Sequence, residues 1–414
     1  MDTRAPSSER SARALAASAF ISNLGDGLQF SALPLVAYLI SRDPLITASV
    51  AAARVLPVVL MALPIAAWVE RYRPSATMSV SLAVRAVAAL LLVLLIATNG
   101  LSFVPLLLLA GVLGIADAAF DTTAGAAVVD AVPEERRPYY NSILSFSATF
   151  GVGLVGPVVG AVLFSLSPVI PFVANAVMLI ASSVILALGY TGGRGITADS
   201  GSGRGFWGRI LEAVKIAWSI PRLRTILILT AAWNLFGWIP EGVLVIFVRE
   251  DLNESNFVYS LLLVASAAGS LLGAAVSSRI SKERSQRFVL LIGTPLYGLL
   301  FIPAAFIHSW ITLSVLFVIQ GLPLMAWSVA SATARQSLIP REALVRVNGL
   351  FYLMAVGLAP IGLMLGPLVA TLSSVRATFL VAGVLLLLTS LVASWLASKA
   401  GAPSSVPTNP ITAD

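Results

Sequence analysis

The chain of 414 residues contains no cysteine and one histidine, His308, and only 11% of its residues are charged. Without cysteine it can form no disulfide bond and no thiolate metal site. So few charged side chains cannot cover the surface of a soluble protein of this length, because the apolar surface left in water would cause aggregation. The shortage of charge therefore points to a chain that is solvated largely by lipid.

Hydrophobic residues make up 58% of the chain, and they gather in runs long enough to cross a bilayer, which takes about 20 residues. We therefore expect an all-α integral membrane fold with twelve transmembrane helices in two pseudo-symmetric six-helix halves. The predicted segments are about 14–41, 45–69, 76–98, 102–129, 140–166, 168–190, 224–248, 256–277, 288–307, 311–337, 346–371 and 376–397.

Basic residues mark one side of the predicted membrane. Most of them fall in the tails and loops on the side of the N terminus, and the opposite loops hold only Arg42, Arg249 and Arg376. By the positive-inside rule both termini are cytoplasmic, in a multi-pass protein of the inner (cytoplasmic) membrane. The net charge of +7 is then a topology signal, and it does not indicate nucleic-acid binding.

The predicted organisation has five parts. They are a cytoplasmic N-terminal tail (1–13), a six-helix half (14–190), a cytoplasmic linker with an amphipathic helix (191–223), a second six-helix half (224–397) and a cytoplasmic C-terminal tail (398–414). We expect no cleavable signal peptide, because the first apolar run is too long for one.

The two halves repeat the same landmarks. Val132-Pro133, followed by Asn141, recurs as Ile339-Pro340, followed by Asn348, and Gly156-Pro157 recurs as Gly366-Pro367. A membrane protein built from two related halves is the usual layout of a secondary transporter, with the substrate site between the halves.

Three motifs resemble the major facilitator superfamily. Residues 66–73, Ala-Ala-Trp-Val-Glu-Arg-Tyr-Arg, resemble its loop signature Gly-x-x-x-Asp-Arg, with Ala66 and Glu70 replacing the glycine and the aspartate. Residues 156–160, Gly-Pro-Val-Val-Gly, resemble an antiporter signature of exporters. Residues 23–27, with Phe120-Asp121, resemble the exporter branch that contains macrolide-efflux and enterobactin-export proteins.

The resemblance implies alternating access by a monomer and assigns roles to several residues. Glu70, Arg71 and Arg73, with Asp130 nearby, would form a cytoplasmic latch between the halves. Gly156, Pro157 and Gly160 would form the antiporter motif. Generic tight packing is the alternative for these three, because glycines allow helices to approach and proline bends them.

Charged residues inside the predicted segments are functional candidates, because each costs about 2.5–3.5 kcal/mol in the bilayer. Depth along the helices, at about 1.5 Å per residue, predicts the ion pairs Asp26–Arg54 and Asp121–Arg85. Burial and Arg54 act in opposite directions on the proton affinity of Asp26, so substrate arrival can release a proton there. We predict Asp26, with Asp117, as the proton-coupling site; permanent structural ion pairs are the alternative.

In the superfamily the first, fourth, seventh and tenth segments line the central cavity, and here these segments carry polar stripes. The predicted cavity residues are Ser22, Gln29, Asn234, Trp238, Glu241, Gln320 and Trp327. Four acids against two arginines near the cavity favour a neutral or cationic substrate.

The sequence therefore predicts a secondary active exporter of a small amphipathic molecule, such as a drug, an antibiotic or a siderophore-like compound, by proton antiport. No cofactor is expected, because the chain lacks a Walker sequence for ATP; a sodium gradient is the alternative driving force. An enzyme is not expected, because the segments offer neither a nucleophile–base pair nor a metal cluster. The expected partners are the substrate, protons and the lipid bilayer.

The sequence leaves three alternatives open. Residues 23–26 also resemble the first helix of ferroportin-type exporters of divalent metals, although no histidine or cysteine lies inside the membrane to bind such a metal. The same fold could instead import a small metabolite. A membrane receptor without transport activity is the remaining alternative.

Overall fold

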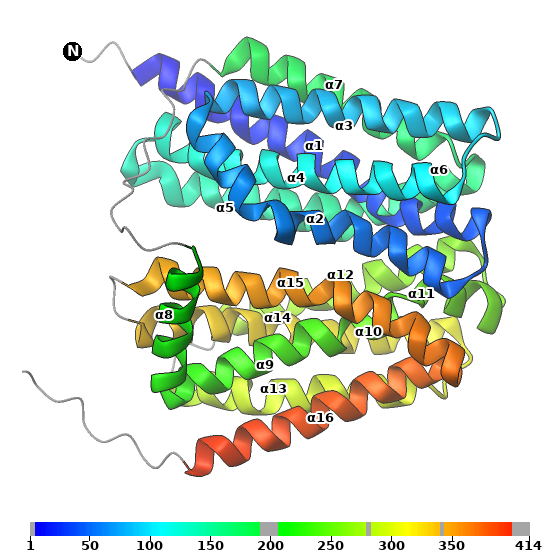
Figure 1. Cartoon of the computed structure of the whole chain (residues 1–414), viewed down its shortest axis with the longest axis vertical. Helices are drawn as coiled ribbons and strands as arrows, with labels where there is room; N and C mark the ends of the chain where they lie inside the picture. Colours follow the sequence, from blue (N-terminus) through cyan, green and yellow to red (C-terminus); the bar gives the residue numbers. More distant parts are fainter. Residues whose placement is uncertain (1–4, 191–205, 279–282, 340–342, 400–414) are drawn as a thin grey trace, which may run out of the picture.

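The structure is a computed structural model that describes residues 5–190, 206–278, 283–339 and 343–399, and these residues form helices joined by short turns (Figure 1). No strand occurs in these ranges. The first half contains α1 (Ala5–Ile40), α2 (Pro44–Arg71), α3 (Pro74–Ala97), α4 (Phe103–Ala131), the 3-10 turn Glu134–Arg136, α5 (Arg137–Ala148), the π-helical turn η2 (Thr149–Val155), α6 (Gly156–Leu166) and α7 (Ile170–Gly189).

Of the predicted linker 191–223, residues 191–205 lie outside the described residues, and the remainder contains the helix α8 (Phe206–Ser219), which packs with the second half. The second half itself contains α9 (Pro221–Phe236), α10 (Trp238–Glu241), α11 (Leu244–Ile246), the π-helical turn η3 (Phe247–Asp251), α12 (Asn256–Ser278), α13 (Glu283–Ala304), α14 (Trp310–Leu338), α15 (Leu344–Leu372) and α16 (Val375–Lys399). The fifth predicted segment corresponds to α5, η2 and α6 together, and the seventh to α9 through η3. The predicted all-α fold with twelve membrane-crossing segments is confirmed.

The outer surface of the helices is apolar, as a lipid-facing surface must be. Large side chains such as Leu108, Leu188 and Leu391 expose more than 60% of their surface. Within the described residues, nine stretches are long and apolar enough to cross a membrane, and α2 and α13 contribute shorter apolar stretches. Water would not tolerate so much exposed apolar surface, whereas a bilayer requires it.

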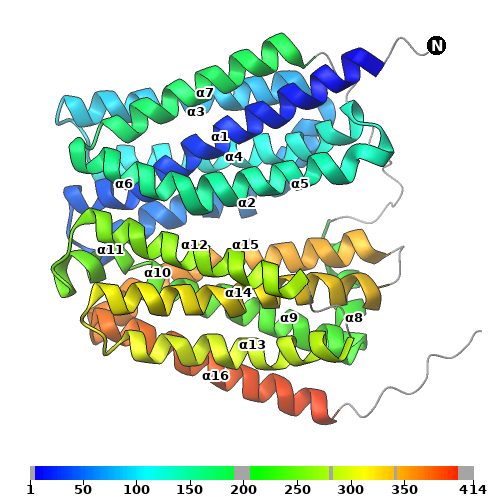
Figure 2. The same cartoon turned by 180° about the vertical axis from the view of Figure 1, so that it is seen from behind.

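The helices form two bundles, α1–α7 and α8–α16, which lie one above the other in Figures 1 and 2. The bundles touch mainly through α2 with α15 and α6 with α12, and further contacts join η2 with α12 and α1 with α11. Within each bundle the same relation recurs, because α2 packs on α4 as α12 packs on α14. The two-fold repeat of the sequence is therefore also a repeat of packing.

Glycines at equivalent places bring helices into close contact in both halves. A Cβ atom on Gly156 would lie 2.6 Å from the carbonyl carbon of Gly27 on α1. In the second half, a Cβ atom on Gly366 would lie 3.6 Å from the Cα atom of Gly242 and against the Ile239 carbonyl oxygen. The glycines of the predicted antiporter motif thus hold α6 against α1.

Gly156→Ala is expected to destabilise the protein by about 1–3 kcal/mol, because the added methyl group must push α6 away from α1. Gly153→Ala is the matched control in the same segment, since a Cβ atom there meets nothing within 4 Å. Thermal unfolding of the two purified variants in detergent checks the difference. Equal melting temperatures would show that the close approach contributes nothing.

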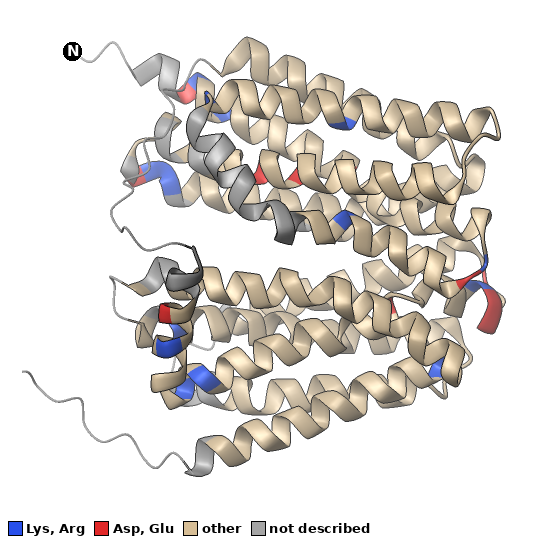
Figure 3. Ribbon diagram, in the orientation of Figure 1, with Lys and Arg blue, Asp and Glu red and all other residues tan. Residues whose placement is uncertain are grey.

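The ends of the bundles nearest the α1–α2 turn are joined across the halves. Tyr38 Oη on α1 donates a hydrogen bond of 3.3 Å to Glu250 Oε1 on η3, and the Arg249 guanidinium lies 5.8 Å from the Tyr38 ring centroid. Figure 3 shows charged residues gathered at the two ends of the described helices, with a few in the middle of α2–α4. That central group contains the strongest candidate site.

Candidate functional site

A buried network of charged residues joins α1, α2, α3 and α4. Arg85 on α3 exposes 1% of its side chain and forms an ion pair with Asp26 on α1. Its Nε lies 2.7 Å from Asp117 Oδ1 on α4, and its Nη1 donates to Ser22 Oγ at 2.9 Å. Arg54 on α2 donates to the other carboxylate oxygen, Asp117 Oδ2, at 2.6 Å. Asp117 thereby bridges both arginines.

These contacts correct both ion pairs predicted from depth. Asp26 pairs with Arg85 instead of Arg54, and Arg54 pairs with Asp117. Asp121 has an exposed side chain and forms no ion pair with any described residue. Depth along a helix gives only the level of a residue in the membrane, whereas pairing also depends on the face from which the side chain leaves and on the reach of a guanidinium.

The network is electrically balanced, with two carboxylates and two guanidinium groups. The Arg85 guanidinium also lies 5.7 Å from the ring centroid of Phe120, whose face attracts a cation. A balanced group avoids the full cost of isolated charges in a low-dielectric interior. Protonation of either carboxylate would upset this balance, so the arrangement can respond to proton binding.

A cavity of about 770 Å³ lies in the second half, within the range typical of sites for drug-sized molecules. A stack of three aromatic rings forms part of its wall: the Trp233 ring lies 4.0 Å from that of Tyr297 and 5.3 Å from that of Trp327, between centroids. The lining also includes Asn234, Trp238, Glu241, Ser331, Arg335, Asn348, Phe351 and Tyr352. This surface suits the flat, apolar body of an amphipathic molecule.

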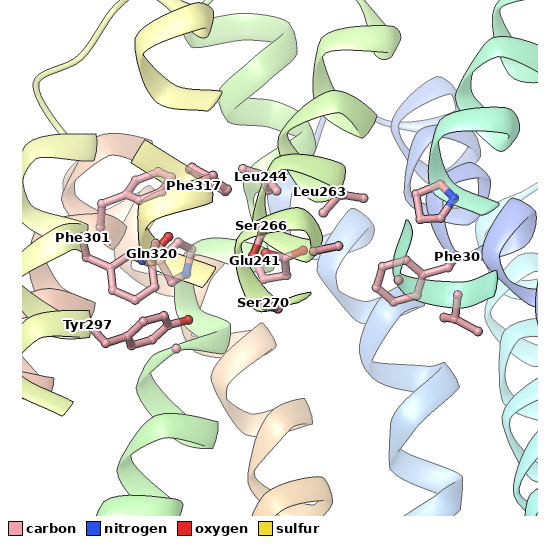
Figure 4. A pocket seen from close by; sticks show the side chains of 17 residues that line it. Phe30, Glu241, Leu244, Leu263, Ser266, Ser270, Tyr297, Phe301, Phe317 and Gln320 are labelled. Carbon is pink, nitrogen blue, oxygen red and sulfur yellow. The ribbon is translucent and has the colours of Figure 1, made fainter. Parts of the chain in front are cut away.

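Four of the predicted cavity residues, Asn234, Trp238, Glu241 and Trp327, line this cavity. A fifth, Gln320, lines a smaller adjoining cavity of about 210 Å³ (Figure 4).

The remaining two predicted cavity residues lie elsewhere. Ser22 accepts the hydrogen bond from Arg85 in the charged network. Gln29 is fully buried, and its Oε1 accepts a hydrogen bond of 3.1 Å from Asn175 Nδ2 on α7. Gln29 therefore belongs to the packing between α1 and α7, and the polar stripe on α1 contacts two different partners.

The latch residues are only partly described. Arg73 is exposed just before α3, whereas the side chains of Glu70, Arg71 and Asp130 lie outside the described set. Residues 1–4, 191–205 and 400–414, which belong to the predicted tails and linker, lie outside it too. Among the residues that are described, no group of three or more acidic or histidine side chains could hold a metal ion.

Comparison with known proteins agrees with this architecture. The family model described as Major Facilitator Superfamily matches residues 15–241 and 234–412. The chain is 24% identical over 383 residues to the multidrug efflux pump Tap of Mycolicibacterium fortuitum, covering 91% of this chain and 93% of that protein.

Two solved structures share the fold. One is a bacterial homologue of the iron transporter ferroportin in its inward-facing state, with a TM-score of 0.72, 15% identity and coverage of 94% of this chain and 99% of that one. The other is a POT family transporter in complex with 5-aminolevulinic acid, with a TM-score of 0.73, 16% identity and coverage of 94% and 96%. Because the family model matches both halves, the chain belongs to the Major Facilitator Superfamily and is a multi-pass membrane transporter.

Proposed function

We propose that this transporter exports a small amphipathic molecule in exchange for protons. The observation that carries the proposal is the balanced network of Asp26, Arg85, Asp117 and Arg54, which lies in the membrane interior of one half while the other half holds a large aromatic cavity. The similarity to a multidrug efflux pump supports export as the direction and an amphipathic compound as the cargo.

The closed end of the structure fits one state of an alternating-access cycle. The halves are joined through Tyr38 and Glu250 at one end, and the large cavity reaches Arg335 and Asn348 near the opposite end of the helices. With cytoplasmic termini, as the basic residues indicate, the cavity faces the cytoplasm and can receive a compound from there. Rocking of the two halves would then expose the cavity to the outside.

The network offers a physical route to coupling. A carboxylate beside a guanidinium favours the ionised form, whereas a carboxylate that loses this partner in a low-dielectric site favours the protonated form. Arg85 contacts both Asp26 and Asp117, and Asp117 also has Arg54 as a partner, so a shift of the Arg85 guanidinium toward Asp117 leaves Asp26 as the carboxylate that is free to take up a proton. Protons bound from the outside would in this way drive the return of the empty transporter.

Growth of a bacterium that lacks its own drug pumps tests the proposal. Expression of the wild type is expected to raise resistance to some members of a panel of antibiotics, dyes and siderophores, and Asp26→Asn is expected to remove that resistance. Glu135→Gln is the matched control, because Glu135 is exposed in the turn before α5. Full resistance in the Asp26→Asn variant would contradict the coupling role of Asp26.

A further inference from the structure

The smaller cavity, of about 210 Å³, is lined by the carboxylate of Glu241. Glu241 lies at the end of α10 and lines both this cavity and the large one. It forms no hydrogen bond or ion pair with any residue that the structure describes. A carboxylate in an apolar cavity is costly unless a cation or a proton accompanies it.

The rest of the lining indicates which kind of cation fits. Five aromatic side chains share the small cavity with Glu241: Phe30, Tyr297, Phe301, Phe317 and Phe379. Figure 4 shows Glu241 between Phe30 on one side and Tyr297, Phe301 and Gln320 on the other. Aromatic faces around a negative charge are the arrangement by which proteins bind ammonium groups, because the ring quadrupole attracts a cation.

Other ligands fit this lining poorly. Among the described residues, the cavity wall contains no arginine, lysine or histidine to bind an anion. A metal ion needs several strong oxygen, nitrogen or sulfur ligands, whereas the described part of this wall offers one carboxylate, Gln320, two serines and the Tyr297 hydroxyl among apolar groups. An organic cation, by contrast, gains from the rings as well as from the carboxylate.

The size and position of the cavity fit one end of a longer molecule. A cavity of about 210 Å³ is smaller than the range of about 300–1,000 Å³ that holds drug-sized ligands. It adjoins the 770 Å³ cavity, with which it shares Gly237, Glu241, Ser266 and Tyr297. A compact headgroup can therefore occupy the small cavity while a flat body lies against the rings of Trp233 and Trp327 in the large one.

We infer that the small cavity is an ammonium-binding subsite, in which Glu241 and the surrounding aromatic rings hold the cationic headgroup of an amphipathic amine. This inference rests on the proposed function and narrows its cargo from amphipathic molecules in general to those with a compact alkylammonium group. Glu241 is the residue that selects charge, and the aromatic side chains select an organic cation over a hydrated inorganic one.

Three fluorescent probes that differ only in the headgroup test the inference. Each carries a dansyl body on a two-carbon linker, which ends in trimethylammonium, in the neutral isostere tert-butyl or in carboxylate. A quaternary ammonium is useful because its charge does not depend on pH. Dissociation constants are measured by fluorescence titration on the purified full-length transporter in lipid nanodiscs, without any gradient.

The wild type is expected to bind the trimethylammonium probe at least about tenfold more tightly than the tert-butyl probe. Glu241→Gln keeps the shape of the side chain and is expected to abolish this preference, with the affinity for the tert-butyl probe unchanged within about twofold. Phe301→Leu should selectively weaken the binding of the trimethylammonium probe, though by less than Glu241→Gln does. Glu135→Gln is the control acid and should change nothing.

Several results would overturn the inference. In Glu241→Gln, these are an equal loss of affinity for the trimethylammonium and tert-butyl probes, or an unchanged preference for the trimethylammonium probe. In the wild type, they are tighter binding of the carboxylate probe than of the trimethylammonium probe, or no binding of the trimethylammonium probe. Thermal unfolding of each variant shows whether a loss of binding comes from loss of the fold.

Failure of the inference can be distinguished from failure of the proposed function. Asp26→Asn is expected to lose coupled export and yet to bind the trimethylammonium probe like the wild type, because Asp26 does not line the small cavity. If Asp26→Asn exports normally, the coupling proposal is wrong and the subsite stands. If Asp26→Asn loses export while Glu241→Gln binds normally, only the subsite is wrong.

Discussion

Arg85→Met is expected to lower the stability of the transporter more than any other single substitution in the charged network. Arg85 is the most deeply buried member and contacts three partners, Ser22, Asp26 and Asp117. Its removal leaves Asp26 without an ion-pair partner in the membrane interior. Breaking a buried ion pair from one side costs about 3–5 kcal/mol, because the remaining charge stays buried. Thermal unfolding in detergent should show a clear decrease in melting temperature.

Two further variants make the stability test specific. Arg42→Met removes an exposed arginine from the turn between α1 and α2, and it is expected to change the free energy of unfolding by no more than about 0.5 kcal/mol. In the double variant Arg85→Met with Asp26→Asn, a neutral amide replaces the carboxylate that would be left unpaired. Part of the stability lost in Arg85→Met should therefore return. A double variant less stable than Arg85→Met alone would contradict this electrostatic explanation.

Asp117→Asn is expected to reduce export on the order of 100-fold, whereas Asp121→Asn should stay within about threefold of the wild type. The two aspartates lie one turn apart on α4 and undergo the same chemical change. Asp117, however, holds Arg54 at 2.6 Å and Arg85 at 2.7 Å, while Asp121 is exposed and forms no ion pair with a described residue. Breaking a buried ion pair costs about 3–5 kcal/mol. If the lower end of this range, about 3 kcal/mol, is added to the barrier of the transport cycle, the rate falls by a factor of about 100.

Initial export rates in cells that contain equal amounts of each variant check this difference. The compound is one to which the wild type confers resistance, and its efflux is followed after preloading. Equal effects of the two substitutions would show that position along α4 matters and the ion pairs do not. A larger effect of Asp121→Asn would restore the pairing that depth alone predicts.

Hydrophobicity alone was sufficient to predict the helices. Runs of about 20 apolar residues can only be helices in a bilayer, because every backbone group must be satisfied within its own segment. The interruptions were not predictable in this way. The π-helical turn Thr149–Val155 divides the fifth segment, and short helices divide the seventh around Gly237 and Gly242. Such local changes in hydrogen bonding depend on close contacts between helices, which hydrophobicity does not describe.

The candidate site was predictable in residue type but not in pairing. Asp26, Arg54, Arg85 and Asp117 stood out because charge is rare in membrane segments, yet their partners depend on helix rotation, which no count along one helix gives. The large cavity contains residues beyond the four segments expected to line it. Tyr297 comes from α13, and Asn348 and Tyr352 come from α15. Of these, only Asn348 had a signal in the sequence, as part of the repeated landmark.

Proton antiport requires that movement of the substrate carries protons in the opposite direction. The purified transporter is reconstituted in liposomes that contain a pH-sensitive dye, with the membrane potential clamped, and a compound from the resistance panel is added outside. As the compound enters through the wild type, protons should leave and the internal pH should rise, and no rise should occur with Asp26→Asn. Entry of the compound through the wild type without any change in internal pH would contradict proton antiport.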